Sequence, residues 1–328
     1  MSSEDSFSSW SPGEPRAGSA GGWDWFAGTD QTAQAAQAGQ AAQPPSTDPE
    51  QPFEATPPVA GDSVLTIVHV YPHLLGTYGD AGNAQVLYRR AVDRGLAAQV
   101  IAVHPGDPLP ALGDVYLLGG GEDAKQTAAA DELRQDGALV AAAERGAAVL
   151  GICAGYQLLG ETFLGVGGAE VPGLGLLEVR TGRLERRAVG NVLVEPVEDL
   201  GLPSMIGFEN HGGATTLGYG IQPMGHTRIG IGNGPDLTEG AWHGTVYGTY
   251  LHGPVLALNP ALADRLLSHA AGELAPLEDT VVEGLRRHRL QQVLPSVARA
   301  GRRRSLLGGR RPDGASGATA TLSAAQPQ

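Results

Sequence analysis

The sequence is poor in cysteine, because Cys153 is the only one in 328 residues. A single cysteine excludes an internal disulfide and fits a reducing compartment, where disulfide scaffolds are not expected. No run approaches the ~20 apolar residues that a membrane-spanning helix needs, and the first residues lack the basic and apolar parts of a secretory signal. We therefore expect a cytoplasmic protein with no transmembrane segment.

Basic residues are also scarce, with 22 Lys and Arg against 35 Asp and Glu, which leaves a formal net charge of -13. Binding to nucleic acid depends on clustered Lys and Arg that contact phosphates. This balance therefore argues against a nucleic-acid partner. Cys and His do not recur at the spacing of a metal site, so we predict no bound metal.

Changes in composition divide the chain into segments. Residues 1–62 are rich in Ser, Gly, Ala, Gln and Pro without an apolar period, which predicts a disordered extension. A folded domain is expected over 63–272 and a helical segment over 273–298. Residues 299–328 are basic and then small and polar, which predicts a disordered tail whose arginines an acidic lipid surface would attract.

Short apolar runs alternate with helical patterns in the first part of this domain, which is typical of βαβ units and a parallel sheet. From 173 to 251, extended runs are split by Gly and Pro, which predicts added antiparallel strands around the same sheet. The fold class is therefore α/β. Strands are expected at 63–71, 97–104, 113–121 and 147–153, and helices at 82–95, 123–146, 259–270 and 277–294.

Cys153 lies where a buried strand is expected to turn into a helix, in "GICAGYQLLG" (151–160). Gly151 and Gly155 suit the crowded strand-to-helix turn that exposes a nucleophile at a sheet edge. The helix N-terminus adds partial positive charge, which favours the thiolate and stabilises a developing oxyanion. This motif indicates a nucleophilic cysteine, and the alternative is a buried cysteine that packs as a small hydrophobe.

A nucleophilic cysteine needs a base. His252 in "GTYLHGP" directly follows an apolar strand, and His211 in "GFENHGG" is its rival; the alternative for His252 is a half-exposed side chain that caps a turn. Gly120 and Gly121 in "LLGGGED" follow a strand, where their N–H groups are candidates to face an oxyanion. Asp80 in "TYGDAGN" lies at the start of a predicted helix. It either caps this helix or has a role in the catalytic site.

With these motifs in this order, the sequence resembles the class I glutamine amidotransferases. The motifs "YGDAGN", "GICAGYQ", "GFENHGG" and "GTYLHGP" narrow the resemblance to GatD-like glutaminase subunits of lipid II isoglutaminyl synthase, in the cobyric-acid-synthase-like branch. The resemblance covers about 63–272. It implies the three-layer α/β fold of this class, with a mostly parallel central sheet and added antiparallel strands.

The resemblance also implies catalytic roles. Cys153 would attack the side-chain amide of L-glutamine, with His252 as the base and later the acid. Gly120 and Gly121 would supply the N–H groups of an oxyanion hole. Most members carry a Glu two residues after this His, which orients the imidazole. That carboxylate is absent here, so the site is expected to be a Cys-His dyad or to use Asp80 as the substitute.

Arg187 in "RRAVGN" matches the substrate-binding arginine of the resembled family. Its guanidinium would bind the α-carboxylate of glutamine through two hydrogen bonds. Arg186 is adjacent and is the alternative, since only the register of the motif favours Arg187.

The resemblance further implies a partner. GatD-like proteins form a heterodimer with a Mur-ligase-like subunit, MurT, and pass ammonia to it. MurT uses ATP, with Mg, to activate the D-glutamate α-carboxyl of the lipid II stem peptide, which becomes D-isoglutamine. We expect no cofactor in this chain and a location at the inner membrane face with the partner. The alternatives are a cobyric-acid-type amidotransferase acting on another carboxylate, a non-catalytic amidotransferase-like binding module and a cysteine peptidase.

Overall fold

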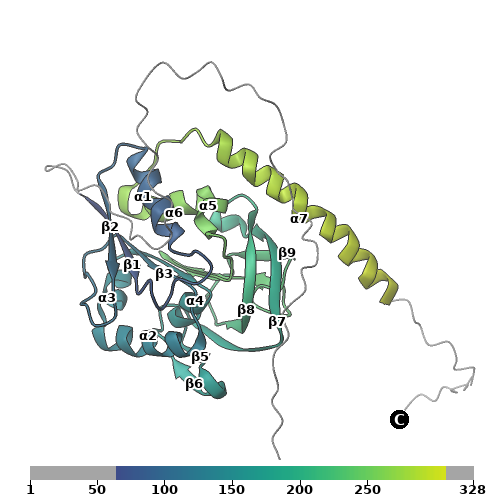
Figure 1. Cartoon of the computed structure of the whole chain (residues 1–328), viewed down its shortest axis with the longest axis horizontal. Coiled ribbons are helices and arrows are strands. Elements are labelled where there is room, and N and C mark those ends of the chain that lie inside the picture. Colours follow the sequence, from purple (N-terminus) through teal and green to yellow (C-terminus); the bar gives the residue numbers. More distant parts are fainter. Residues whose placement is uncertain (1–63, 308–328) are drawn as a thin grey trace, which may run out of the picture. The chain divides into compact units, whose positions relative to one another are not determined.

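The computed structural model describes residues 64–307, and of 294–307 it describes the helical backbone alone. The predicted extension at 1–62 and residues 308–328 of the tail predicted over 299–328 lie outside the described residues. The central element is a six-stranded sheet (Figure 1). Its strands, in spatial order, are β11 (Ala241–His243), β12 (Val246–Thr249), β4 (Ala148–Ile152), β3 (Val115–Leu118), β1 (Leu65–Val70) and β2 (Ala98–Val103).

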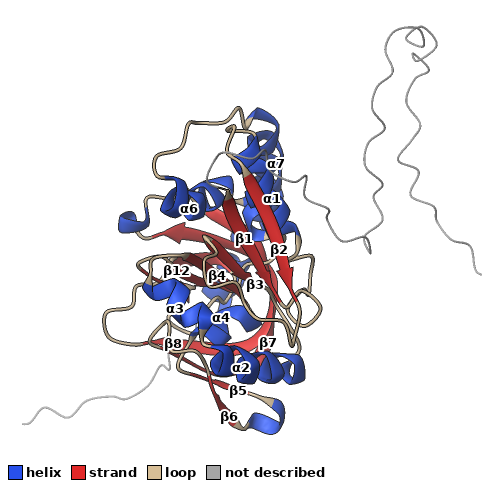
Figure 2. Ribbon diagram, turned by 90° about the vertical axis from the view of Figure 1, so that its left-hand side faces the viewer, coloured by secondary structure: helices blue, strands red, loops and turns tan. Residues whose placement is uncertain are grey.

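Neighbouring strands of this sheet run parallel from β12 to β2, and only β11 is antiparallel. Every residue of β3 and β4 is buried. Strands that are apolar on both faces need helices on both faces. Figure 2 shows this arrangement, with α1 (Gly82–Val92) and α6 (Pro260–Ala271) on one face and α2 (Asp123–Asp136), α3 (Ala138–Glu144) and α4 (Ala154–Leu159) on the other. The prediction of a three-layer α/β fold with a mostly parallel central sheet is confirmed.

The remaining strands form a second sheet, so the prediction that they surround the first sheet is wrong. Its strands are β10 (Thr238–Glu239), β9 (Gly225–Ile229), β7 (Val179–Pro196), β5 (Thr162–Leu164) and β6 (Glu170–Pro172), with β8 (Met205–Leu217) paired antiparallel along β7. Only β11 and β12 of the region 173–251 join the first sheet. Apolar residues of the long β7–β8 hairpin, among them Val192, Val194 and Met205, join the same core as the first sheet. The short runs in the sequence do not reveal this hairpin.

Two helical predictions differ from the structure. The helix expected over 123–146 is broken at Gly137, whose φ of 69° ends α2 and starts α3. The last helix, predicted over 277–294 in a segment that ends at 298, is α7 (Thr280–Leu307), so residues 299–307 are helical and not part of a disordered tail. The short elements α5 (Val255–Leu258), η1 (Val166–Gly168) and η2 (Glu198–Leu200) complete the secondary structure of the described residues.

The carboxyl ends of β1, β3, β4 and β12 meet at one edge of the first sheet, next to the β7–β8 hairpin. Ligand sites of open parallel sheets lie at this edge. Within residues 64–307, no helix combines the length and the apolar character required to cross a bilayer.

Candidate active site

Cys153 occupies a strained turn between β4 and α4. Its φ of 52° is unusual for a residue with a side chain. Glycine is required on both sides: a Cβ at Gly151 would lie 2.7 Å from the backbone of Gly155, and one at Gly155 would lie 2.3 Å from the carbonyl oxygen of Leu118. This packing produces the tight elbow that the glycine spacing predicts. Cys153 lies at the tip of the elbow, and 9% of the residue is exposed.

His252 and Asp80 form a buried pair beside this cysteine. Nδ1 of His252 lies 3.2 Å from Oδ2 and 3.3 Å from Oδ1 of Asp80, and both residues are almost fully buried. Helix α1 has no side-chain cap, so Asp80 does not have the alternative role of a simple helix cap. His252 is 1% exposed, so the alternative that it is a half-exposed residue capping a turn is wrong.

The environment of His252 favours its protonated form. Burial by itself lowers the pKa of His252, but the hydrogen bond with Asp80 and the neighbouring Cys153 outweigh it and raise the pKa to about 9. Nε2 is buried and has no hydrogen-bond partner among the described residues. That nitrogen is therefore available to exchange a proton with the thiol or with a bound substrate.

The glycine turn after β3 has a different role from the one predicted for Gly120. The N–H of Gly120 donates to Oδ2 of Asp80 over 2.8 Å, so it is not available to an oxyanion. A Cβ at Gly120 would lie 2.8 Å from Cε1 of His252, which explains why glycine is needed here. The N–H groups of Gly121 and Ala154 have no acceptor in the described part of the chain. They are the better candidates for an oxyanion hole.

Arg187 reaches the site because strand β7 bulges. The ladder between β7 and β8 pairs Arg183 with Gly213 and resumes at Ala188 with His211, so residues 184–187 face only Gly212. Such bulges redirect side chains. Arg187 lines the cavity in front of Cys153, whereas Arg186 does not.

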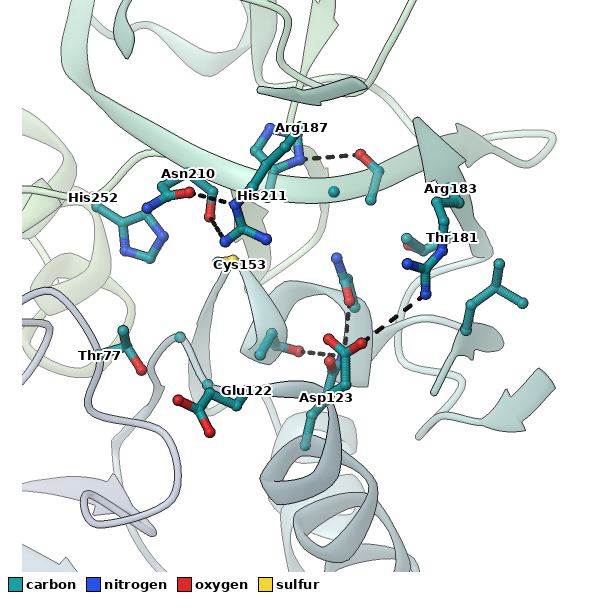
Figure 3. Close-up of a pocket in the computed structure, with 18 of the residues that line it drawn as sticks. Thr77, Glu122, Asp123, Cys153, Thr181, Arg183, Arg187, Asn210, His211 and His252 are labelled. Carbon is teal, nitrogen blue, oxygen red and sulfur yellow. Dashed lines mark hydrogen bonds and ion pairs between the residues drawn. The ribbon is translucent and has the colours of Figure 1, made fainter. Parts of the chain in front are cut away.

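Figure 3 shows Arg187 above Cys153, held by Asn210. The Nε of Arg187 donates to Oδ1 of Asn210 over 2.6 Å, and Nη2 donates to the carbonyl oxygen of Asn210 over 3.0 Å. The Nδ2 of Asn210 donates in turn to the hydroxyl of Tyr78, whose ring packs against His252 at 5.0 Å between centroids. Asn210 and Tyr78 were missed as site residues, although both occur in the quoted motifs.

The cavity has a volume of about 410 Å³ and a polar wall. His211, the rival for the base, also lines the cavity, but its Nδ1 lies 3.0 Å from the carbonyl oxygen of Gly213 and its ring stacks on Tyr250 at 3.7 Å. It therefore lacks the carboxylate partner on Nδ1 that Asp80 provides for His252, which makes His252 the better candidate. Arg183, a second cation not predicted from the sequence, lines the cavity and lies 4.0 Å from Asp123. Among residues 64–307, no group of three or more His, Cys, Asp and Glu side chains is arranged to hold a metal ion.

The chain matches the CobB/CobQ-like glutamine amidotransferase domain over residues 66–260. It is 34% identical over 244 residues to the GatD subunit of lipid II isoglutaminyl synthase (glutamine-hydrolyzing) of Staphylococcus aureus, covering 73% of this chain and 98% of GatD. Cobyric acid synthase of Sphingopyxis alaskensis is 35% identical over 207 residues, which cover 56% of this chain and 39% of the synthase. A crystal structure of a glutamine amidotransferase superposes with a TM-score of 0.43 at 23% identity, covering 62% of this chain and 98% of that chain.

Proposed function

The chain belongs to the CobB/CobQ-like glutamine amidotransferase family, and on this premise we propose that it is the glutamine-hydrolysing subunit of a lipid II isoglutaminyl synthase. The similarity to GatD, which extends over 98% of that protein, supports this assignment within the family. The observation that carries the chemistry is the buried Asp80–His252 pair beside the Cys153 elbow.

The proposed reaction begins with the Cys153 thiolate, which a protonated His252 stabilises. The sulfur attacks the side-chain amide carbon of L-glutamine, and the resulting oxyanion faces the N–H groups of Gly121 and Ala154. Nε2 of His252 then donates its proton to the amide nitrogen, the C–N bond breaks and ammonia leaves. Neutral His252 next takes a proton from water, which attacks the thioester and releases glutamate and the thiolate.

Arg187 is proposed to bind the α-carboxylate of glutamine. Its guanidinium lines the cavity, and its two hydrogen bonds to Asn210 fix its orientation before substrate arrives. A pre-oriented guanidinium loses less side-chain entropy on binding a carboxylate.

The ammonia is proposed to pass to a MurT-like Mur ligase in a heterodimer. The relative GatD is named as a subunit, which supports a separate partner. On this proposal the partner holds ATP and Mg and activates the D-glutamate α-carboxyl of the lipid II stem peptide, which the ammonia converts to D-isoglutamine. We expect the complex in the cytoplasm at the inner membrane face, because its proposed acceptor is a lipid.

An amidotransferase of the cobyric-acid type is the second candidate, and the similarity to cobyric acid synthase favours it. The two candidates share the glutaminase chemistry and differ in the acceptor and in the partner. Co-purification with a Mur-ligase-like protein, followed by an amidation assay on lipid II, separates them. Amidation of a corrinoid carboxylate and not of lipid II would replace the first candidate by the second.

The substitution Cys153→Ala tests the proposal. It is expected to abolish glutamine hydrolysis and to leave ammonia-dependent amidation by the partner intact, because only the ammonia source is lost. The control is His226→Ala, an exposed histidine on β9 outside the cavity, which is expected to hydrolyse glutamine at the wild-type rate. Glutaminase activity that survives Cys153→Ala would exclude the thiol as the nucleophile.

A further inference from the structure

A buried carboxyl group lies behind the candidate active site and outside its cavity. Glu239, the last residue of β10, is 0% exposed. Its Oε1 accepts two hydrogen bonds, from Oγ1 of Thr249 over 2.9 Å and from the N–H of Tyr250 over 2.7 Å. Burying a carboxyl group is costly. A carboxyl group that is buried at this cost is therefore expected to stabilise the groups that it contacts.

The two residues that Glu239 contacts lie at the end of β12, where the sheet stops. The pairing of β12 with β4 ends at Thr249, whose carbonyl oxygen accepts the N–H of Cys153 over 2.8 Å. Beyond this point the chain leaves the sheet and turns toward His252. Because the strand pairing has ended, the N–H groups of Tyr250 and Leu251 would be buried without hydrogen-bond partners unless side chains accepted them. An unpaired buried N–H group costs ~1–3 kcal/mol.

Glu239 and Thr249 satisfy these N–H groups. Oε1 of Glu239 accepts the N–H of Tyr250, and Oγ1 of Thr249 accepts the N–H of Leu251 over 3.0 Å while donating to the same Oε1. The backbone N–H of His252 donates to Phe208 on β8 over 2.8 Å. One carboxyl oxygen therefore binds two of the groups in the segment that leads from the strand to His252.

The same segment contacts the helix that follows Cys153. The hydroxyl of Tyr250 accepts a hydrogen bond from Nε2 of Gln157 over 3.2 Å and lies 2.7 Å from Oγ1 of Thr215. The N–H of Gln157 donates to the carbonyl oxygen of Cys153 over 3.1 Å. The position of Tyr250 is therefore linked to both the histidine segment and the cysteine elbow.

We propose that Glu239 is a positioning residue, whose carboxyl oxygen holds residues 249–251 so that His252 meets Cys153 and Asp80. The inference rests on the proposed function, because it takes Cys153 and His252 as the reacting pair. The role requires an acceptor for two donors and not a negative charge. Glutamine provides such an acceptor at the same length, whereas leucine has a similar volume and provides none.

The test compares Glu239→Gln and Glu239→Leu in the full-length protein. Because Cys153 is the only cysteine, the rate of alkylation by iodoacetamide as a function of pH reports directly on the Cys153–His252 pair, without substrate or partner. Glu239→Leu is expected to lower kcat and the alkylation rate at neutral pH by about 10- to 100-fold, because His252 is displaced. KM for glutamine should stay near wild type, and Glu239→Gln should restore both rates to within about threefold.

The control is Leu266→Ala, which removes a buried side chain from α6 without contact to the cavity. It is expected to lower Tm and leave the pH profile of alkylation unchanged. If Glu239→Leu behaves in the same way, or if Glu239→Gln is as impaired as Glu239→Leu, the positioning role is wrong. If Glu239→Leu does not fold, Thr249→Val replaces it, with the same expected loss of kcat and of alkylation rate.

The outcomes also distinguish this inference from the proposed function. A wild-type protein that hydrolyses no glutamine even together with a MurT-like partner, but whose alkylation profile responds to Glu239→Leu, contradicts the proposed function and supports the positioning role. An active wild type whose two rates are unchanged in Glu239→Leu contradicts only the positioning role.

Discussion

At the scale of single residues, the site depends on how closely backbone and side chains approach one another. Asp80 accepts hydrogen bonds from the N–H of Gly120 and from His252 at once, so its carboxylate fixes both the glycine turn and the imidazole. Asp80, which is distant from His252 in the sequence, places a carboxylate beside Nδ1 of His252, so it is the candidate to replace the missing Glu.

Asp80→Asn is expected to lower kcat for glutamine hydrolysis by about 100- to 10,000-fold, as loss of an orienting carboxylate does in catalytic triads. Burial acts to lower the pKa of His252, and Asp80 opposes it, so the pKa should fall from about 9 in the variant. NMR titration of the imidazole measures this pKa. An unchanged pKa together with wild-type kcat would exclude Asp80 from the site.

Gly120→Ala is expected to displace His252, because the added Cβ would lie 2.8 Å from Cε1 of the imidazole and 3.2 Å from Oδ2 of Asp80. Such a displacement of ~1 Å lowers kcat by about 100-fold. The matched control is Gly190→Ala on β7, where a Cβ meets no atom within 4 Å. Equal kcat in the two variants would show that the space at Gly120 is not needed for the reaction.

Arg187→Ala is expected to raise KM for glutamine by about 10- to 100-fold with little change in kcat, because a contact to the bound α-carboxylate is lost in ground state and transition state alike. Arg186→Ala, whose side chain does not line the cavity, serves as the control. Steady-state kinetics that show the KM effect in Arg186→Ala would reverse the assignment.

At the scale of elements, partly buried ion pairs connect the last helix to the domain. Arg90 of α1 donates to both carboxylate oxygens of Asp264 over 2.7 Å and to those of Asp279 over 2.8 and 2.9 Å. Asp279 directly precedes α7, and Asp264 lies in α6. One guanidinium therefore joins three segments that are distant in the sequence.

Arg90→Met is expected to lower the free energy of unfolding by about 3 kcal/mol, because it removes the guanidinium that binds Asp279 and leaves Asp264 paired with Arg94. Chemical denaturation measures the loss, and hydrogen exchange should show faster opening of α7. The control Arg89→Met removes an exposed pair with Asp93, which contributes at most about 0.5 kcal/mol. Equal losses in the two variants would contradict the role of the buried cluster.

At the scale of the whole molecule, Glu239 makes stability depend on pH. Burial raises the pKa of Glu239 from its ordinary 4.5 to about 7, against the hydrogen bonds from Tyr250 and Thr249, which lower it. The folded protein therefore holds a proton that the unfolded chain releases near pH 4.5. The stabilisation is complete below this pH and is lost as pH rises through 7.

Between pH 5 and 8, the free energy of unfolding of the wild type is therefore expected to fall relative to Glu239→Gln, by about 3 kcal/mol. Urea denaturation of both proteins across this range measures the difference. A difference that is constant with pH would show that Glu239 does not titrate there in the folded protein.

Much of the local structure could be predicted from the sequence. The glycine spacing around Cys153 and the apolar strand before His252 are local patterns, and both residues lie at the predicted sheet edge. Their catalytic roles stay predictions. The helix break at Gly137 was not predicted, because the apolar period continues on both sides of it and only the left-handed φ of 69° at Gly137 separates the two helices.

The sequence by itself determined the parallel α/β core, the elbow at Cys153 and the candidates at the strand ends, because these depend on neighbouring residues and on repeating patterns. Tertiary structure alone decided that Gly120 serves Asp80, that Arg187 and not Arg186 faces the cavity, and that Glu239 supports the histidine segment. These contacts join residues from separate strands and turns. Their distances depend on sheet order, on a bulge and on where a strand ends, and none of these leaves a local pattern in the sequence.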